Sequence, residues 1–167
     1  MDTPPDSATL ADFYKTVSSL SFMLLGLWWV VIQLRYKDGR GTPGDRRHAY
    51  GVLLFFLSPG IMGLLAVVDP TSPAIWRTVF AVVAALGLIE IALYFTSGSP
   101  RTGVTDALRA VGLLDYVLIG LVALAPTIAG SVGLRAVEAE AFLLTVLVLV
   151  GIHMVFLAIV EPEDSAT

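Results

Sequence analysis

The orientation of this chain is decided by residues 35–48, which read Arg35-Tyr-Lys-Asp-Gly-Arg-Gly-Thr-Pro-Gly-Asp-Arg-Arg-His48. The stretch holds five of the ten Lys and Arg residues and lies between two long apolar runs. Short loops rich in Lys and Arg are retained on the cytoplasmic side of a membrane, and they attract anionic lipid headgroups. We therefore expect this loop to face the cytoplasm through its basic residues, Arg35, Lys37, Arg40, Arg46 and Arg47.

The composition is that of a membrane protein. Of the 167 residues, 56% are hydrophobic and 14% are charged, and the mean hydropathy is +0.83, whereas soluble domains carry about 25% charged residues. The net charge of −4 gives no reason to expect nucleic acid as a partner. The lack of cysteine excludes disulfides, zinc–thiolate sites and iron–sulfur clusters, and no motif indicates a metal or a cofactor.

Five apolar segments are each long enough to cross a hydrocarbon core about 30 Å thick, which takes about 20 helical residues. We expect an all-α polytopic membrane protein, a bundle of five transmembrane helices that forms a single domain over residues 1–167. Pro- and Gly-rich turns separate the segments, as in Asp69-Pro-Thr-Ser-Pro73. The helices are expected at about 16–34, 49–68, 74–95, 105–129 and 135–160, with polar tails at 1–12 and 161–167.

The distribution of Lys and Arg over the loops predicts the topology. The first and third loops hold seven of these residues and the second and fourth hold two, so the odd loops belong in the cytoplasm. The N-terminus is then expected outside and the C-terminus in the cytoplasm. The high use of Ala, Val, Gly and Arg is typical of a GC-rich bacterium, so we expect an inner (cytoplasmic) membrane location.

Three ionisable residues lie inside the expected helices, namely Glu90, Asp115 and His153. Such residues are costly in lipid, so each is a functional hypothesis. Counted from the expected ends of the apolar runs, all three sit roughly 6–10 Å inside the cytoplasmic boundary at 1.5 Å per residue. They could form one polar layer that relays protons or binds a cation and responds to pH. The alternative is a structural hydrogen-bond network that fastens three helices together.

The first helix carries a polar stripe at spacings of three and four residues, which places its members on one face. The stripe could line a water-filled path, or it could serve close helix packing with a Lys that reaches the headgroups. Its members are Lys15, Ser19, Phe22, Gly26, Trp29 and Gln33, with Ser18 beside them. In the second helix, Pro59, Gly60 and Gly63 predict a kink near the middle of the membrane.

The sequence lacks several features that known classes of membrane protein require. No lysine lies deep in a helix to hold retinal, no second intramembrane histidine accompanies His153 to ligate haem, and no helix carries the arginine ladder of a voltage sensor. We expect a homo-oligomeric channel or small-solute pore for inorganic ions, embedded in the lipid bilayer. A non-catalytic accessory or scaffold subunit is the first alternative. A membrane enzyme that acts on a lipid-linked substrate, with His153 and a carboxylate as acid and base, is the second.

Overall fold

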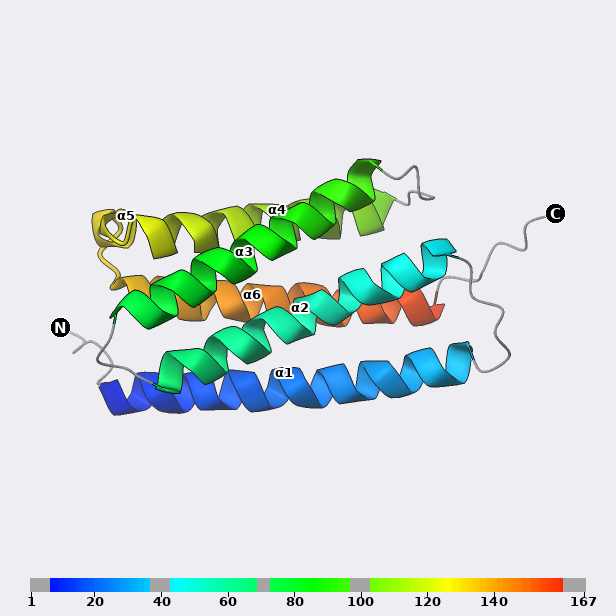
Figure 1. The fold of residues 1–167 in the computed structure, drawn as a ribbon, viewed down its shortest axis with the longest axis horizontal. Helices are drawn as coiled ribbons and strands as arrows, with labels where there is room; N and C mark the ends of the chain where they lie inside the picture. Colours follow the sequence, from blue (N-terminus) through cyan, green and yellow to red (C-terminus); the bar gives the residue numbers. More distant parts are fainter. Residues whose placement is uncertain (1–6, 37–42, 69–72, 97–102, 161–167) are drawn as a thin grey trace.

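The computed structural model describes residues 7–36, 43–68, 73–96 and 103–160, and 95% of these residues are helical, with no strand among them. The all-α class is therefore confirmed. The long helices are α1 (Ser7–Arg35), α2 (Pro43–Val68), α3 (Pro73–Thr96), α4 (Gly103–Leu124) and α6 (Ala136–Val160), and a short α5 (Thr127–Ser131) lies between the last two (Figure 1).

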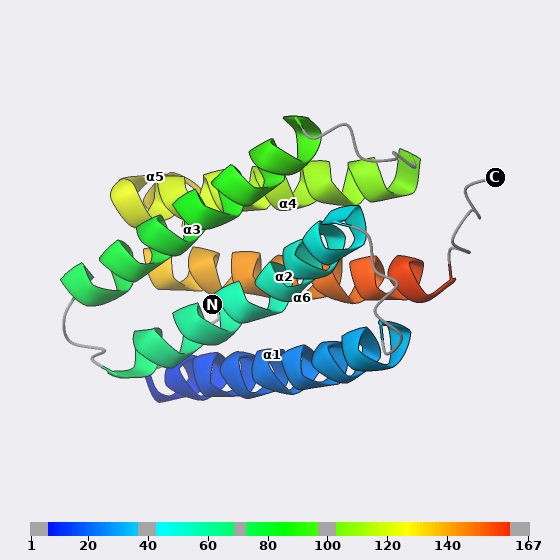
Figure 2. The same ribbon diagram turned by 45° about the vertical axis from the view of Figure 1, so that its right-hand side comes forward.

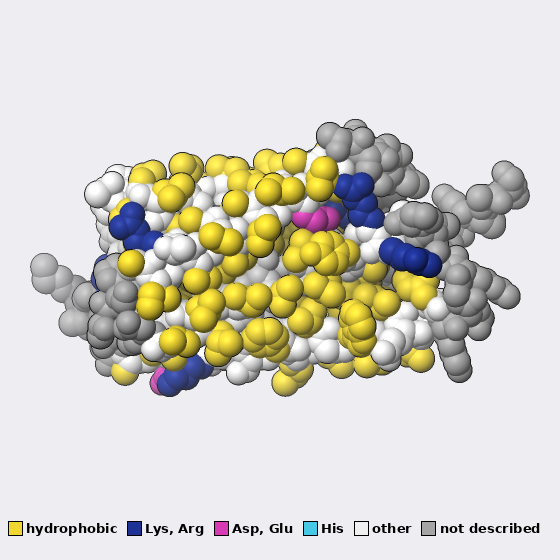
Figure 3. All heavy atoms as spheres, in the orientation of Figure 1, with side chains coloured by type: hydrophobic (Ala, Val, Ile, Leu, Met, Phe, Trp, Pro, Cys, Tyr) yellow, Lys and Arg dark blue, Asp and Glu magenta, His cyan; other side chains and the backbone are white. Residues whose placement is uncertain are grey.

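The five long helices are each long and apolar enough to cross a membrane. Hydrophobic side chains cover most of the flank of the bundle shown in Figure 3, which is the surface that lipid would contact. The chain is thus an integral membrane protein with five spans, as the sequence predicts. Which end faces the cytoplasm stays a prediction.

The helices run antiparallel in sequence order, and α6 closes the bundle by packing against α1, α2 and α4 (Figures 1 and 2). The bundle therefore has two ends. We call one the His48 end, where α1, α3 and α6 end and α2 and α4 begin. We call the opposite one the Tyr14 end, where α1, α3 and α6 begin.

Three expected boundaries are corrected by the structure. Helix α2 begins at Pro43 and not at 49, so Arg46 and Arg47, which were expected in the loop, are helical. Helix α1 begins at Ser7, so residues 7–12, which the sequence suggested as part of a polar tail, are helical. Helix α4 ends at Leu124 and not at 129, because Pro126 has no N–H to continue the ladder beyond the bond from the Ala125 amide to the Leu121 carbonyl. The expected tail at 161–167 lies outside the described residues.

The residues expected to kink α2 lie in its contact with α1. The helix continues across Pro59, and the Ser18 hydroxyl on α1 donates to the Gly60 carbonyl at 2.9 Å. A Cβ on Gly63 would lie 2.8 Å from the Tyr14 carbonyl oxygen. The glycines therefore let the two backbones approach closely, as small residues do between membrane helices.

The Gly63→Ala variant should lose about 1–3 kcal/mol of stability, because its methyl group meets backbone that has no rotamer to change. Its matched control is Gly26→Ala, where nothing lies within 4 Å of an added Cβ and stability should rise by about 0.5–1 kcal/mol. Thermal unfolding in detergent, followed by circular dichroism, measures both. An equal loss in the two variants would contradict this contact and would indicate that the Gly26 face packs on a second copy.

Candidate functional site

The inner face of α4 is unusually polar. Arg109, Asp115 and Tyr116 are all buried there, at 0%, 3% and 1% exposure, with Thr105 one turn before Arg109. Spacings of three and four residues place these side chains on the face that α3 and α6 cover. These polar groups of α4 therefore point into the bundle and not toward lipid.

At the His48 end, Arg109 is held by two neighbouring helices. Its guanidinium carbon lies 3.2 Å from the centroid of the Tyr94 ring on α3, a cation–π contact. Its Nη2 atom lies 3.2 Å from Nδ1 of His48 on α2. Glu90 of α3, which is half-buried, interacts electrostatically with the guanidinium. This end of the interior thus holds an acid, a base and an imidazole together.

In the middle of the bundle, Tyr116 connects α4 to its neighbours. Its hydroxyl donates to Ser58 Oγ on α2 at 3.0 Å. Its ring occupies the space over Gly87 on α3, where a Cβ would overlap it. Both Glu90 and Asp115 lie close enough to interact electrostatically with the Tyr116 hydroxyl. Tyr116 therefore lies between Asp115 and Glu90, the latter at the His48 end.

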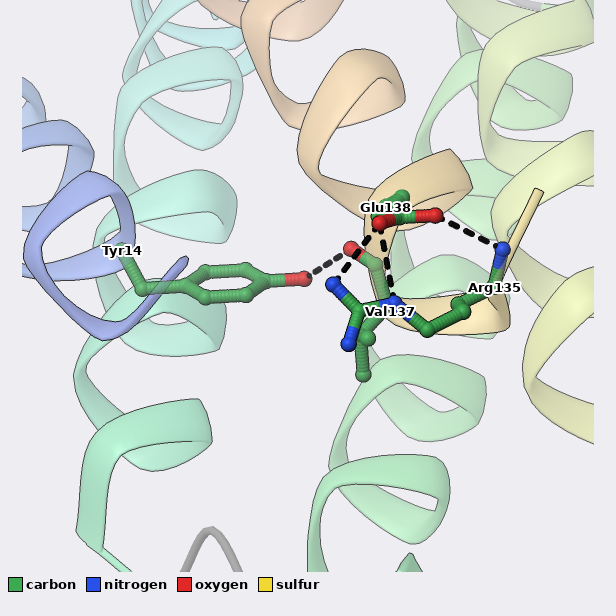
Figure 4. A network of polar contacts seen from close by, with 4 residues as sticks. All are labelled: Tyr14, Arg135, Val137 and Glu138. Atoms are coloured by element: carbon green, nitrogen blue, oxygen red, sulfur yellow. Dashed lines mark hydrogen bonds and ion pairs between the residues drawn. The ribbon is translucent and has the colours of Figure 1, made fainter. Parts of the chain in front are cut away.

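The start of α6 is fixed by a local cap and by a bond from α1 (Figure 4). The Glu138 carboxylate accepts from the Arg135 amide at 2.8 Å and from its Nε at 2.9 Å, which satisfies a free N–H at the helix start. The Tyr14 hydroxyl on α1 donates to the Val137 carbonyl at 2.7 Å. These bonds hold the first turn of α6 against α1.

That first turn places Glu140 inside the bundle, fully buried at 0% exposure. Neither of its oxygens has a hydrogen-bond partner among the described residues, and the same is true of Asp115 Oδ2. The two carboxyl groups interact with each other electrostatically. Two neighbouring carboxylates inside a membrane, without a cation beside them, are costly. The pair is stabilised when it takes up a proton or another small cation.

The residues of the expected polar layer are not brought together. Asp115 lies twelve residues after Gly103, roughly 18 Å along α4 at 1.5 Å per residue, whereas Glu90 lies six residues before the end of α3. His153 is exposed on the outer side of α6, with Nδ1 2.7 Å from the Leu149 carbonyl. His153 therefore does not face the two carboxyl groups, and a common membrane depth for Glu90 and Asp115 stays a prediction. The enzyme hypothesis needs these three groups in one cleft, and the outward position of His153 does not support it.

The polar stripe of α1 faces outward. Lys15, Ser19, Gly26 and Gln33 are exposed, and Lys15 pairs with Asp12 at 3.3 Å. Ser18 is buried against α2. The stripe does not line a path inside one chain, and the expectation that it lines a pore formed by several copies stays a prediction. A shallow groove of about 220 Å³ lies beside it, lined by Lys15, Ser18, Ser19, Leu64, Val67 and Val68.

The basic residues that predicted the topology lie at the His48 end as far as the structure describes them. Arg35 donates to the Ala158 carbonyl, which ties α1 to the end of α6. Arg46 is exposed and Arg47 is half-buried in the first turns of α2. Lys37 and Arg40 lie outside the described residues.

Sequence reasoning missed Arg109 and Glu140. Arg109 was counted among the charges of the third loop, and Glu140 was not singled out. One signal could have found Arg109: it precedes Gly112 and Tyr116 by three and seven residues, so it shares their face. Comparison of the chain with protein-family models, with curated proteins and with solved structures gave no match. The site is therefore interpreted from its geometry.

The burial of the three carboxyl groups predicts their reactivity toward dicyclohexylcarbodiimide, an apolar reagent that reaches membrane carboxyls from lipid. Half-buried Glu90 should be labelled in the folded protein, whereas Asp115 and Glu140 should be protected. Peptide mass spectrometry of the folded and the denatured protein locates the label, and Glu90→Gln is the control for assignment. Labelling of Glu140 in the folded protein would contradict its placement.

Proposed function

We propose that this protein conducts protons across the membrane through the interior of its own helix bundle. The observation that carries the proposal is the buried pair of Asp115 and Glu140, which has no hydrogen-bonding partner for three of its four oxygens among the described residues. A buried pair that needs a cation, inside a membrane bundle, is suited to take up and release protons.

The pair belongs to a series of proton-exchanging groups that extends toward both ends. Toward the His48 end, Tyr116 interacts with Asp115 and with Glu90, and Glu90 interacts with Arg109. Toward the Tyr14 end, Glu140 interacts with the Tyr14 hydroxyl. Carboxyl, hydroxyl and imidazole groups each donate and accept protons, which a relay requires.

The packing at the middle favours protons over larger ions. The Tyr116 ring is 1% exposed and fills the space above Gly87, and Phe55 lies against it with the ring centroids 6.1 Å apart. A hydrated metal ion needs a wide, water-filled passage, whereas a proton moves between neighbouring polar groups and single waters. The tight centre therefore supports a narrow relay.

The proposal changes one part of the expectation drawn from the sequence. The pathway lies inside each chain, and a pore at a symmetry axis between copies is not needed. Assembly as a homo-oligomer remains a separate prediction. We also propose the inner membrane of a bacterium as the location, with the His48 end in the cytoplasm, on the strength of the Lys and Arg distribution.

Proton flux into liposomes tests the proposal directly. Purified protein is reconstituted, a potassium diffusion potential is imposed with valinomycin, and a trapped dye reports the internal pH. The wild-type protein should conduct, and Glu140→Gln and Asp115→Asn should each lower the flux about tenfold or more, as expected when a proton-transfer group is removed. Glu140→Gln should unfold at no lower temperature than wild type, because it replaces a carboxylate that is buried without a partner.

The matched control is Asp12→Asn, which also neutralises a carboxylate but at a side chain that is 76% exposed at the surface. Its flux should equal that of the wild type. Equal flux in Glu140→Gln, Asp115→Asn and wild type would overturn the pathway. A wild-type protein that conducts no protons would favour the accessory subunit instead.

A further inference from the structure

Glu90 and Arg109 lie close together without being hydrogen-bonded to each other. The position that a Cβ would take on Gly51 is 2.7 Å from Glu90 Oε1 and 3.5 Å from Arg109 Nη1. These two atoms are therefore no more than about 6 Å apart, a range in which a positive charge strongly favours an ionised carboxylate. Both atoms are buried, and neither has a hydrogen-bond partner among the residues that the structure describes. The guanidinium thus acts on this carboxyl group through its charge.

The Arg109 charge is held in one place. The side chain is fully buried. Its Nη2 atom lies 3.2 Å from His48 Nδ1, and its guanidinium carbon lies 3.2 Å from the centroid of the Tyr94 ring. A guanidinium keeps its proton in proteins, so it takes no part in proton exchange. Arg109 is therefore a permanent positive charge beside a group that can gain and lose a proton.

Glu90 is the carboxyl group of the proposed series that lies nearest to the His48 end. It precedes the end of α3 by six residues, roughly 9 Å at 1.5 Å per residue. It is also half-buried, whereas Asp115 and Glu140 are buried. A proton that leaves the interior toward the His48 end therefore leaves the last carboxyl group at Glu90.

We propose that Arg109 makes Glu90 release its proton at the His48 end. This inference rests on the proposed proton conduction. Burial in the membrane favours the protonated form of a carboxyl group, and a nearby positive charge opposes it. A proton on Glu90 leaves the Arg109 charge uncompensated, so the proton is repelled. The emptied carboxylate can then accept the next proton.

Each step moves one proton between oxygen atoms. Tyr116 interacts electrostatically with both Asp115 and Glu90. Its hydroxyl gives its proton to the Glu90 carboxylate as it takes up the proton of Asp115, so one O–H bond forms for each one that breaks. Glu90 then gives the proton to water at the His48 end. Arg109 keeps its charge throughout and acts only through Glu90.

The other charges near Glu90 are fewer and weaker. Arg47, half-buried near the start of α2, acts on Glu90 in the same direction as Arg109. Asp106 on α4 interacts with Arg109 and offsets part of its charge. His48 accepts from Arg109 through Nδ1, because a guanidinium can only donate, so this imidazole is neutral. The titratable and charged groups around the Glu90–Arg109 pair are Arg47 and His48 on α2, Tyr94 on α3, and Asp106 and Tyr116 on α4.

Labelling of Glu90 by dicyclohexylcarbodiimide in the full-length protein tests this control directly, because the reagent attacks the protonated carboxyl group. In the wild type the labelling rate should fall as the pH is raised. In Arg109→Gln the rate at alkaline pH should be about tenfold or more above that of the wild type, because the proton is no longer repelled. Arg109→Lys keeps the charge and should restore wild-type labelling. Arg46→Gln removes an exposed arginine at the same end and is the control that should change nothing.

Proton flux in the same liposomes measures the consequence. Arg109→Gln should conduct about tenfold less at neutral pH, because Glu90 keeps its proton and cannot accept the next one, and the flux should recover at alkaline pH. Arg109→Lys should keep the wild-type pH profile. Arg109→Met is the second uncharged variant and decides the matter if Arg109→Gln fails to fold, since methionine packs well against an aromatic ring such as Tyr94.

The results separate the two proposals. Faster Glu90 labelling and a flux profile moved to higher pH in the uncharged variants support the role of Arg109. Unchanged labelling, or faster labelling with an unchanged flux profile, overturns that role and leaves proton conduction intact. A wild-type protein that conducts no protons overturns the proposed function, and the release step with it.

Discussion

The interior of this bundle depends on one constraint, the cost of placing charged groups where lipid provides no water. A charged side chain in a membrane span is stable only if protein groups surround it. Helix α4 meets this requirement by reversing the arrangement of a soluble helix, with Arg109 and Asp115 inside and leucines outside. Tyr94 on α3 and His48 on α2 contact the Arg109 guanidinium. These contacts join α2, α3 and α4 at the His48 end.

Packing between the polar groups is provided by aromatic rings that fit against glycines. A Cβ at Gly112 would lie 2.6 Å from the Phe55 ring, and one at Gly151 would lie 2.7 Å from Phe56. Tyr116 fits over Gly87 in the same way. Rings that interlock with backbone have little freedom to move, so the polar groups that they separate are held at fixed distances. A relay needs this rigidity, because proton transfer depends on short and constant separations between groups.

The five spans and two of the interior carboxyl groups could be predicted from the sequence. Apolar runs of about 20 residues are a strong signal, and Glu90 and Asp115 stand out within them. The contacts of the site could not be predicted, because they join helices that are distant in the chain. Arg109 looks like a boundary charge until His48, 61 residues away, is placed beside it. His153 was misplaced because α6 is apolar on nearly every side, so its pattern did not show which side faces the bundle.

The two halves of the interior, one toward the His48 end and one toward the Tyr14 end, differ in charge. The difference affects where a proton would rest on its way between them. The His48 half contains both signs of charge, with Glu90 beside Arg109, so this pair is balanced when Glu90 is ionised, and a proton on Glu90 leaves the Arg109 charge uncompensated. The Tyr14 half contains Asp115 and Glu140 and, among the described side chains, no basic group within hydrogen-bonding distance of Glu140. A proton that enters from the Tyr14 end therefore meets first the place that is most stabilised by a positive charge. It then moves toward the Arg109 region, which already carries a positive charge. Under the proposed function, the carboxyl pair is the site where a proton rests, and the Arg109 region is the barrier that it crosses.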